Sequence, residues 1–409
     1  HGHYQIEMDC NACHTPGMGV QQDACLNCHQ SELKASRDTH SASKFKDPTN
    51  APLLESLDVT KCTTCHEEHV ESRTTEMGLS IPSDYCANCH QETLENRPSH
   101  KNFAFDSCST SGCHNYHDNL ALYENFLVSH VSDEELKAPA QVLARPVSAD
   151  SQRLPKPDAP AKAMSDEVHA EWMQSTHADV GVNCRACHQP LTSTQQDITS
   201  AAPTWSDSVP PEQCGHCHAF ELERFGLGHH GMRVASGLGK MTPGESRLPM
   251  HSAMNAHELD CNSCHQAHTD DTGFAAVDAC LKCHTDEHSL AYKNSSHYQL
   301  WQDEMSGSGA PGSGVSCATC HMPRMEQDGK VVVDHNQNAN LRPNEKMIRG
   351  VCLNCHSLQI SLDALADKSL IANCFHGQPS EQVESIRMAQ AWFELKEREK
   401  QERKKRRNQ

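Results

Sequence analysis

The stretch CNACH at residues 10–14 decides the fold, because the same pattern recurs along the chain. Ten copies contain two cysteines, separated by two residues, and a histidine directly after the second cysteine. They are Cys10/Cys13/His14, Cys25/Cys28/His29, Cys62/Cys65/His66, Cys86/Cys89/His90, Cys184/Cys187/His188, Cys214/Cys217/His218, Cys261/Cys264/His265, Cys280/Cys283/His284, Cys317/Cys320/His321 and Cys352/Cys355/His356. An eleventh site, Cys108/Cys113/His114, has four residues between its cysteines. Composition alone would produce only about 0.1 copies of the short pattern, so the repetition is not a chance feature.

The repeated pattern is the attachment signature of c-type haem. Two thiols add across the haem vinyl groups, and the imidazole that follows binds the iron as the proximal ligand. Zinc ribbons, disulfide frameworks and thioredoxin-like redox pairs also use Cys-x-x-Cys, but they do not need a histidine directly after it. The sequence therefore predicts eleven covalently attached haem c groups, each with its proximal histidine.

The composition predicts an unusual core. Only 36% of the residues are hydrophobic and 5% are aromatic, which is little for the core of a chain of 409 residues. Buried haem macrocycles would supply the missing apolar volume. We therefore expect a mainly α fold with short helices, extensive loops and little β structure, wrapped around a stacked chain of haems.

The use of the cysteines and the first residues of the chain indicate the cellular compartment of the protein. Cys374 is the one cysteine outside the pattern, so we expect a buried thiol and no disulfide framework within the chain. Haem attachment of this type occurs outside the bacterial cytoplasm, which predicts a periplasmic or extracellular protein. The start at His1, close to the first motif, suggests a cleaved signal peptide. The sequence contains no run of about 18 apolar residues, so no transmembrane helix is predicted.

The charge bears on the partners. A net charge of −19 argues against nucleic-acid binding. It fits a carrier that meets a basic redox partner protein, or it reflects only the solubility of an acidic protein.

We predict four segments from the spacing of the motifs. Residues 1–130 hold five sites and form an N-terminal pentahaem domain, and residues 165–377 hold six sites and form a hexahaem domain. Residues 131–164 carry five prolines and no cysteine, which is typical of an extended linker. Residues 378–409 are expected to form a C-terminal charged helix. Its end, KEREKQERKKRRNQ, is either a solvated helix end or a docking tail for an acidic or membrane-bound partner.

The histidines between the motifs are candidates for the second axial ligand. Of the 30 histidines, 11 are proximal ligands and 19 remain, so every iron could be bis-histidine and closed to substrate. His69 and His117 follow a proximal histidine by three residues, close to one helical turn, so each should point to a neighbouring haem. The predicted distal ligands are His40, His69, His100, His117, His130, His177, His230, His257, His268, His297 and His335. Their pairing with particular haems stays open.

Residues 165–395 contain four longer stretches that resemble a known superfamily. They are WMQSTHADVGVNCRACH, CHTDEHSLAYKNSSHYQLW, GVSCATCHMPR and VVVDHNQNANLRPNEKMIRGVCLNCHSLQISLDAL. They resemble the superfamily of pentahaem nitrite reductase, octahaem hydroxylamine oxidoreductase and octahaem tetrathionate reductase. The resemblance implies a catalytic haem at the fifth site from the C-terminus, which here is Cys214/Cys217/His218.

The same resemblance implies that Asp286 and His288 line an active haem, with His288 as a proton donor. His288 could also be a twelfth distal ligand or a partner of a haem propionate. Several features depart from the superfamily. His218 stands where nitrite reductases commonly have Lys, Gly312 stands where they place a catalytic His, and no Tyr follows His356.

Two functional hypotheses follow. The first is an undecahaem electron-transfer protein that carries electrons between a donor and a distant acceptor, which we favour because eleven haems exceed the needs of one active site. The alternative is a reductase of nitrite, hydroxylamine or tetrathionate at the Cys214/Cys217/His218 haem. Self-association through terminal haems is compatible with either hypothesis.

Overall fold

The structure is a computed structural model of the chain, and two compact units make up its fold. The first unit comprises His1–Ala140 and Asn338–Gln409, and the second comprises Gln141–Gln337. The predicted segments, with their boundaries after residues 130, 164 and 377, remain predictions. The structure describes residues 3–35, 40, 43–75, 78–97, 100, 103–108, 114–118, 122, 124–138, 142–143, 156–163, 165–189, 205–341 and 344–407.

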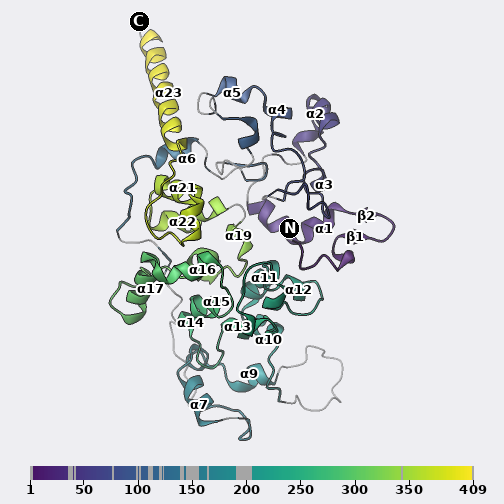
Figure 1. Cartoon of the computed structure of the whole chain (residues 1–409), viewed down its shortest axis with the longest axis vertical. Helices are drawn as coiled ribbons and strands as arrows, with labels where there is room; N and C mark the ends of the chain where they lie inside the picture. The colour runs from purple at the N-terminus through teal and green to yellow at the C-terminus, as the bar shows by residue number, and fades with distance from the viewer. Residues whose placement is uncertain are drawn as a thin grey trace. The chain divides into compact units, whose positions relative to one another are not determined.

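The first unit consists of short helices joined by loops, with one long helix near its C-terminal end (Figure 1). Its α-helices are α1 (Gln22–Ala35), α2 (Ala51–Ser56), α3 (Cys62–Cys65), α4 (Ala87–His90), α5 (Thr93–Asn96), α6 (Glu124–Ser129), α19 (Asn338–Leu341), α20 (Met347–Gly350), α21 (Leu358–Ala366), α22 (Lys368–Ala372) and α23 (Ser385–Arg407). Its 3-10 helices are η1 (Cys10–Ala12), η2 (Lys44–Lys46), η3 (Pro48–Asn50), η5 (Phe105–Ser107), η9 (Asn344–Lys346) and η10 (Cys352–Asn354).

The second unit is built in the same way from helices of one to three turns. Its α-helices are α7 (Asp166–Met173), α8 (Thr176–Asp179), α9 (Cys184–His188), α10 (Pro211–Gly215), α11 (Ala219–Leu227), α12 (Met232–Ala235), α13 (Cys261–Cys264), α14 (Thr272–Ala276), α15 (Asp278–Leu281), α16 (Glu287–Ala291), α17 (Ser296–Ser306) and α18 (Cys317–His321). Its 3-10 helices are η6 (Pro243–Glu245), η7 (Ser252–Met254) and η8 (Tyr292–Asn294).

Regular β structure in the described residues is limited to two hairpins. In the first unit β1 (His14–Thr15) pairs antiparallel with β2 (Gly19–Val20), and in the second β3 (Arg324–Gln327) pairs antiparallel with β4 (Lys330–Val333). The register of the second hairpin places Arg324 opposite Val333. The prediction of a mainly α fold with extensive loops and little β structure is therefore confirmed.

The apolar core of the first unit lies where its two chain segments meet. Leu358 and Leu362 of α21 pack with Ile348 of α20 and with Leu127 of α6. Helix α23 adds Ile386 to this cluster, and its first turns lie beside α6 (Figure 1). This apolar cluster is small for a unit of this length.

Two further predictions concern single features. Cys374 is buried, with 7% of its surface exposed. Among the described residues, no helix has both the length and the apolar character needed to cross a membrane.

Candidate haem sites

Several attachment motifs fold as a single helical turn that starts at the first cysteine. These turns are α3, α9, α13 and α18. Residues i, i+3 and i+4 of a helix share one face, so the two thiols and the imidazole of a motif point to the same side. The side chains of Asn183, Asp260 and Ser316 cap three of these turns by accepting backbone N–H groups, which stabilises so short a helix. None of the described cysteines forms a disulfide bond, whereas Cys113 lies outside the described residues.

Four of the described attachment cysteines are exposed. They are Cys28 and Cys217, together with Cys10 and Cys89. Cys28 lies within α1 beside His29, which is also exposed. Cys217 lies in the turn between α10 and α11, outside either helix. The role of these four cysteines in haem attachment stays a prediction.

Each of ten proximal histidines faces a second histidine from elsewhere in the same unit. In the first unit, by ring-centroid distance and interplanar angle, the pairs are His14 with His69 (6.5 Å, 17°), His29 with His3 (5.8 Å, 58°), His66 with His117 (6.3 Å, 20°), His90 with His40 (6.1 Å, 88°) and His114 with His100 (6.2 Å, 46°). In the second unit they are His188 with His268 (6.0 Å, 28°), His218 with His177 (6.3 Å, 78°), His265 with His335 (6.1 Å, 39°), His284 with His230 (6.2 Å, 51°) and His321 with His288 (6.1 Å, 86°).

The spacing of these pairs fits an iron between the two rings. A metal–imidazole bond is about 2 Å long, so an iron with two axial imidazoles holds their ring centroids about 6 Å apart. The ten distances lie between 5.8 and 6.5 Å, and each pair contains one proximal histidine. The residues present therefore fit haem with two histidine ligands, whose chemistry is the reversible Fe(III)/Fe(II) couple.

Hydrogen bonds at Nδ1 orient several of these imidazoles. Nδ1 of His40 donates to the carbonyl oxygen of Tyr116 at 2.8 Å, and Nδ1 of His188 donates to that of Ser206 at 2.7 Å. A carbonyl oxygen only accepts, so the proton is on Nδ1 and the lone pair of Nε2 is left for a metal. The same arrangement occurs between His66 and Gly78 O (3.0 Å) and between His335 and Val333 O (2.9 Å).

Burial favours the neutral form of many of these imidazoles. Burial, reinforced by a neighbouring imidazole, lowers the pKa of His230 and of His321 to about 4. Burial also lowers the pKa of His90, His114, His265, His268, His284, His335 and His356. Since a metal ligand must be the neutral imidazole, these side chains are prepared for ligation near neutral pH.

Eight of the predicted distal ligands face a proximal histidine, and two further histidines do so as well. The eight are His40, His69, His100, His117, His177, His230, His268 and His335. The further two are His3, which the sequence does not single out, and His288. The Nδ1–Glu68 Oε1 contact of His3 at 2.8 Å joins residues 65 positions apart, and no local sequence signal indicates it.

The other predicted distal ligands lie in different surroundings. His257 is exposed. His130 has its Nδ1 2.7 Å from Asp133 Oδ2 and its ring against Phe126, and His297 is half-buried in α17. A ligand role for these three residues, and the sixth ligand of the haem attached next to His356, stay predictions.

The residues that the superfamily resemblance assigns to catalysis lie in the ligand shells of three sites. His218, the proximal histidine of the implied catalytic haem, faces His177. His288 faces His321. Asp286 caps α16 by accepting the N–H of Ser289 at 3.1 Å, and its Oδ2 lies 3.8 Å from Nδ1 of His284.

Three pairs of consecutive attachment sites are close neighbours in space. The side chains of Cys25 and Cys62, of Cys214 and Cys261, and of Cys280 and Cys317 lie within hydrogen-bonding distance of each other. Each of these contacts joins the first cysteine of one motif to the first cysteine of the next.

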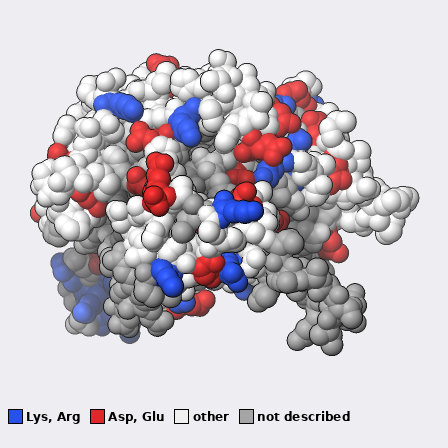
Figure 2. All heavy atoms as spheres, turned by 90° about the horizontal axis from the view of Figure 1, so that it is seen from below, with Lys and Arg blue, Asp and Glu red and all other residues white. Residues whose placement is uncertain are grey.

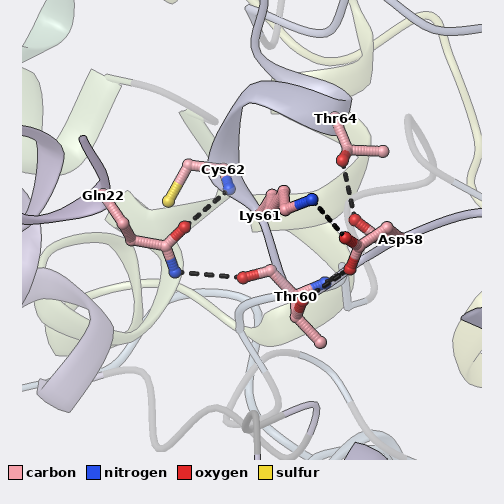
Figure 3. A network of polar contacts seen from close by, with 6 residues as sticks. All are labelled: Gln22, Asp58, Thr60, Lys61, Cys62 and Thr64. Carbon is pink, nitrogen blue, oxygen red and sulfur yellow. Dashed lines mark hydrogen bonds and ion pairs between the residues drawn. The ribbon is translucent and has the colours of Figure 1, made fainter. Parts of the chain in front are cut away.

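A polar network holds one of these junctions together (Figure 3). Gln22 of α1, which also carries Cys25, donates through Nε2 to the carbonyl oxygen of Thr60 at 3.0 Å and accepts the N–H of Cys62 at 3.2 Å. Asp58 accepts the N–H of Thr60 and pairs with the ammonium group of Lys61 at 2.9 Å. Gln22, three residues before Cys25 of the second attachment site, therefore fixes the start of helix α3 at the third attachment site.

A buried ion pair supports the loop that carries His335. Arg224 of α11 donates to both carboxylate oxygens of Asp334 at 2.8 Å. Asp334 Oδ1 also accepts the N–H of Asn336 at 2.8 Å, so the carboxylate holds both sides of His335. Bidentate pairs of this kind are geometrically specific, so this contact fixes the backbone next to His335.

Family models match both ends of the chain. Residues 2–91 match the model of cytochrome c3, and residues 290–407 match that of cytochrome c552. No curated protein and no solved structure matches the chain. Both matched families carry covalently bound haem c, in agreement with the attachment motifs and the imidazole pairs. The chain is therefore a multihaem c-type cytochrome.

Proposed function

We propose that this protein is an undecahaem cytochrome that carries electrons along a chain of closely packed haems between a donor and an acceptor. The observation that carries the proposal is the set of ten imidazole pairs. In each pair a second imidazole stands where a substrate would have to bind the iron. An iron with two fixed histidine ligands exchanges electrons without forming or breaking a ligand bond.

The order of the attachment sites supports conduction along the chain. Contacts between first cysteines join sites two and three, seven and eight, and nine and ten. Neighbours along the sequence are thus neighbours in space at these three junctions. Electrons passing between haem edges would follow the sequence order there.

The alternative is reduction of nitrite, hydroxylamine or tetrathionate at the Cys214/Cys217/His218 haem. That reaction needs an iron with an open or displaceable sixth position. At this site His177 lies 6.3 Å from His218, ring centre to ring centre, which favours the electron-transfer role. His288 likewise serves better as a ligand than as a proton donor, because its ring faces His321.

Two measurements on the holoprotein test the proposal. Mass spectrometry of the denatured protein should give eleven covalent haems per chain, and the ferric EPR spectrum should be dominated by low-spin haem. A high-spin signal that changes on addition of nitrite or hydroxylamine would favour the reductase. So would turnover of nitrite, hydroxylamine or tetrathionate with a reduced viologen donor. A His177→Ala variant is the matched control, because it opens the sixth position at the implied catalytic haem.

Location and partners belong to the same proposal. Covalent haem attachment supports a periplasmic or extracellular location, where redox partner proteins would supply and remove electrons. Acidic and basic side chains lie interspersed on the face drawn in Figure 2. The exposed end of α23 is different, because it gathers Lys404, Lys405, Arg406 and Arg407. This basic end would attract an acidic or membrane-bound partner, and terminal haems of two copies could meet in self-association.

A further inference from the structure

Tyr116 touches the axial ligand of one candidate haem site with both its ring and its backbone. Its ring stacks on His40 with the centroids 4.3 Å apart and the planes 18° apart. Its carbonyl oxygen accepts the Nδ1–H of the same imidazole at 2.8 Å. The hydroxyl group of Tyr116 donates to the carbonyl oxygen of Val59 at 3.2 Å, which holds the far end of the ring.

The next residue, His117, is the distal imidazole of a different site. Its ring meets Tyr116 edge-on, with the centroids 5.1 Å apart. A turn fixes this dipeptide, because Asn115 Oδ1 accepts the N–H groups of His117 at 2.9 Å and of Asp118 at 2.8 Å. His117 faces His66, and His40 faces His90. Tyr116 therefore contacts the ligands of the third and the fourth attachment sites.

Given the proposed bis-histidine haems, on which the inference rests, we propose that Tyr116 is a positioning residue that fixes the imidazole plane of His40. An axial imidazole retains one rotation, about its bond to the iron. The hydrogen bond at Nδ1 restrains one edge of the ring, and the stacked tyrosine restrains its face. Together they hold His40 at 88° to His90.

The angle between axial imidazole planes has a spectroscopic signature. Near-perpendicular planes leave two iron d orbitals almost degenerate, so the low-spin ferric haem gives a highly anisotropic EPR signal, whereas near-parallel planes give an ordinary rhombic signal. Three pairs among the described residues are near-perpendicular: His40/His90 at 88°, His288/His321 at 86° and His177/His218 at 78°. The highly anisotropic signal therefore contains a separable contribution from His40.

The test compares spin-integrated EPR spectra of the wild-type holoprotein and three variants. Tyr116→Ala removes the stacked ring, so His40 should turn away from the perpendicular and about one third of the highly anisotropic signal should move to the rhombic region. Tyr116→Phe keeps the ring and the carbonyl oxygen and should retain the wild-type spectrum. Trp205→Ala is the matched control, because Trp205 stacks at 4.6 Å on His188, whose pair with His268 is near-parallel at 28°. It should leave the highly anisotropic signal unchanged.

Each outcome decides between the claims. A Tyr116→Ala protein with its full haem content and an unchanged highly anisotropic signal overturns the positioning role. Loss of haem from Tyr116→Ala and from the bulkier Tyr116→Leu also overturns it, since the tyrosine would then be needed for assembly. A wild-type spectrum without low-spin bis-histidine signals refutes the proposed function instead.

Discussion

Replacing His288 by Ala separates the electron-transfer role from the catalytic role most sharply. His288 faces His321 at 6.1 Å, and it lies outside the motif of Cys317 and Cys320 that is predicted to attach the haem. The variant should therefore keep eleven haems while one iron in eleven loses its sixth ligand. His288 and His321 are both half-buried, and the position vacated by the imidazole suits a small neutral ligand.

Carbon monoxide measures this change, because it binds ferrous haem only where the sixth position is open or easily vacated. Titration of the reduced protein, followed in the Soret band, should show one more CO bound per chain in His288→Ala than in the wild type. His376→Ala is the matched control: His376 is exposed and is not among the predicted ligands, so its loss should leave CO binding at the wild-type value.

The reasoning fails if His288→Ala binds no more CO than the wild type. It also fails if the wild type already turns over nitrite or hydroxylamine and His288→Ala abolishes that activity. The second result would return His288 to the role of proton donor beside an open iron.

Three further predictions follow from other contacts. Gln22→Ala should lower the free energy of unfolding by about 1–3 kcal/mol, since two hydrogen bonds are lost, and should weaken the exciton couplet of stacked haems in Soret circular dichroism. Gln21→Ala, which loses only a contact to Met18 O, should have neither effect. Equal effects of the two variants would contradict the role of Gln22 in joining the second and third attachment sites. Arg224→Met leaves the Asp334 carboxylate buried without its cation, so denaturant unfolding should show a free energy of unfolding lower by about 3–5 kcal/mol. The double variant Arg224→Met/Asp334→Leu should recover much of this stability. No recovery would argue against the lost ion pair as the cause. Replacing Lys404, Lys405, Arg406 and Arg407 by Gln should abolish salt-sensitive sedimentation with phosphatidylserine vesicles, whereas Glu397→Gln should retain it; vesicle binding that is unchanged in the quadruple variant would exclude the helix end as the docking element.

Much of what was predicted follows from the spacing of residues within and next to the attachment motifs. A thiol, a second thiol three residues on and an imidazole one residue later share a helical face, so the motif specifies an attachment site wherever it occurs. His69 and His117 were predicted as ligands of neighbouring haems from their three-residue offset, and each faces the proximal histidine of another motif. The shortage of apolar residues likewise predicted short helices and extensive loops.

Burial of the individual motifs could not be read from spacing. The thiols of Cys28 and Cys217 are exposed, whereas those of Cys25 and Cys214 are half-buried, although all of them belong to motifs of the same spacing. Exposure depends on which distant segments pack over a motif, and the five residues of the motif do not specify those segments.

The spacing of residues along the sequence also does not predict which histidines face each other. His3 reaches its site through a contact with Glu68, and His335 lies opposite His265, seventy positions away. The sequence left His288 as a proton donor beside an active haem, a twelfth distal ligand or a partner of a haem propionate, and the fold turns its ring to His321. Nothing local to these residues indicates which proximal histidine each of them meets.

The sequence by itself determined the cofactor, the number of attachment motifs and the helical, loop-rich character of the chain, because these depend on residues within one helical turn and on overall composition. Only the tertiary structure decided which imidazoles face each other and at what angle, because packing between distant segments brings the second histidine of each pair to the first. The same packing places Tyr116 against His40 and Arg224 against Asp334. The axial ligands are therefore oriented by contacts that no motif contains.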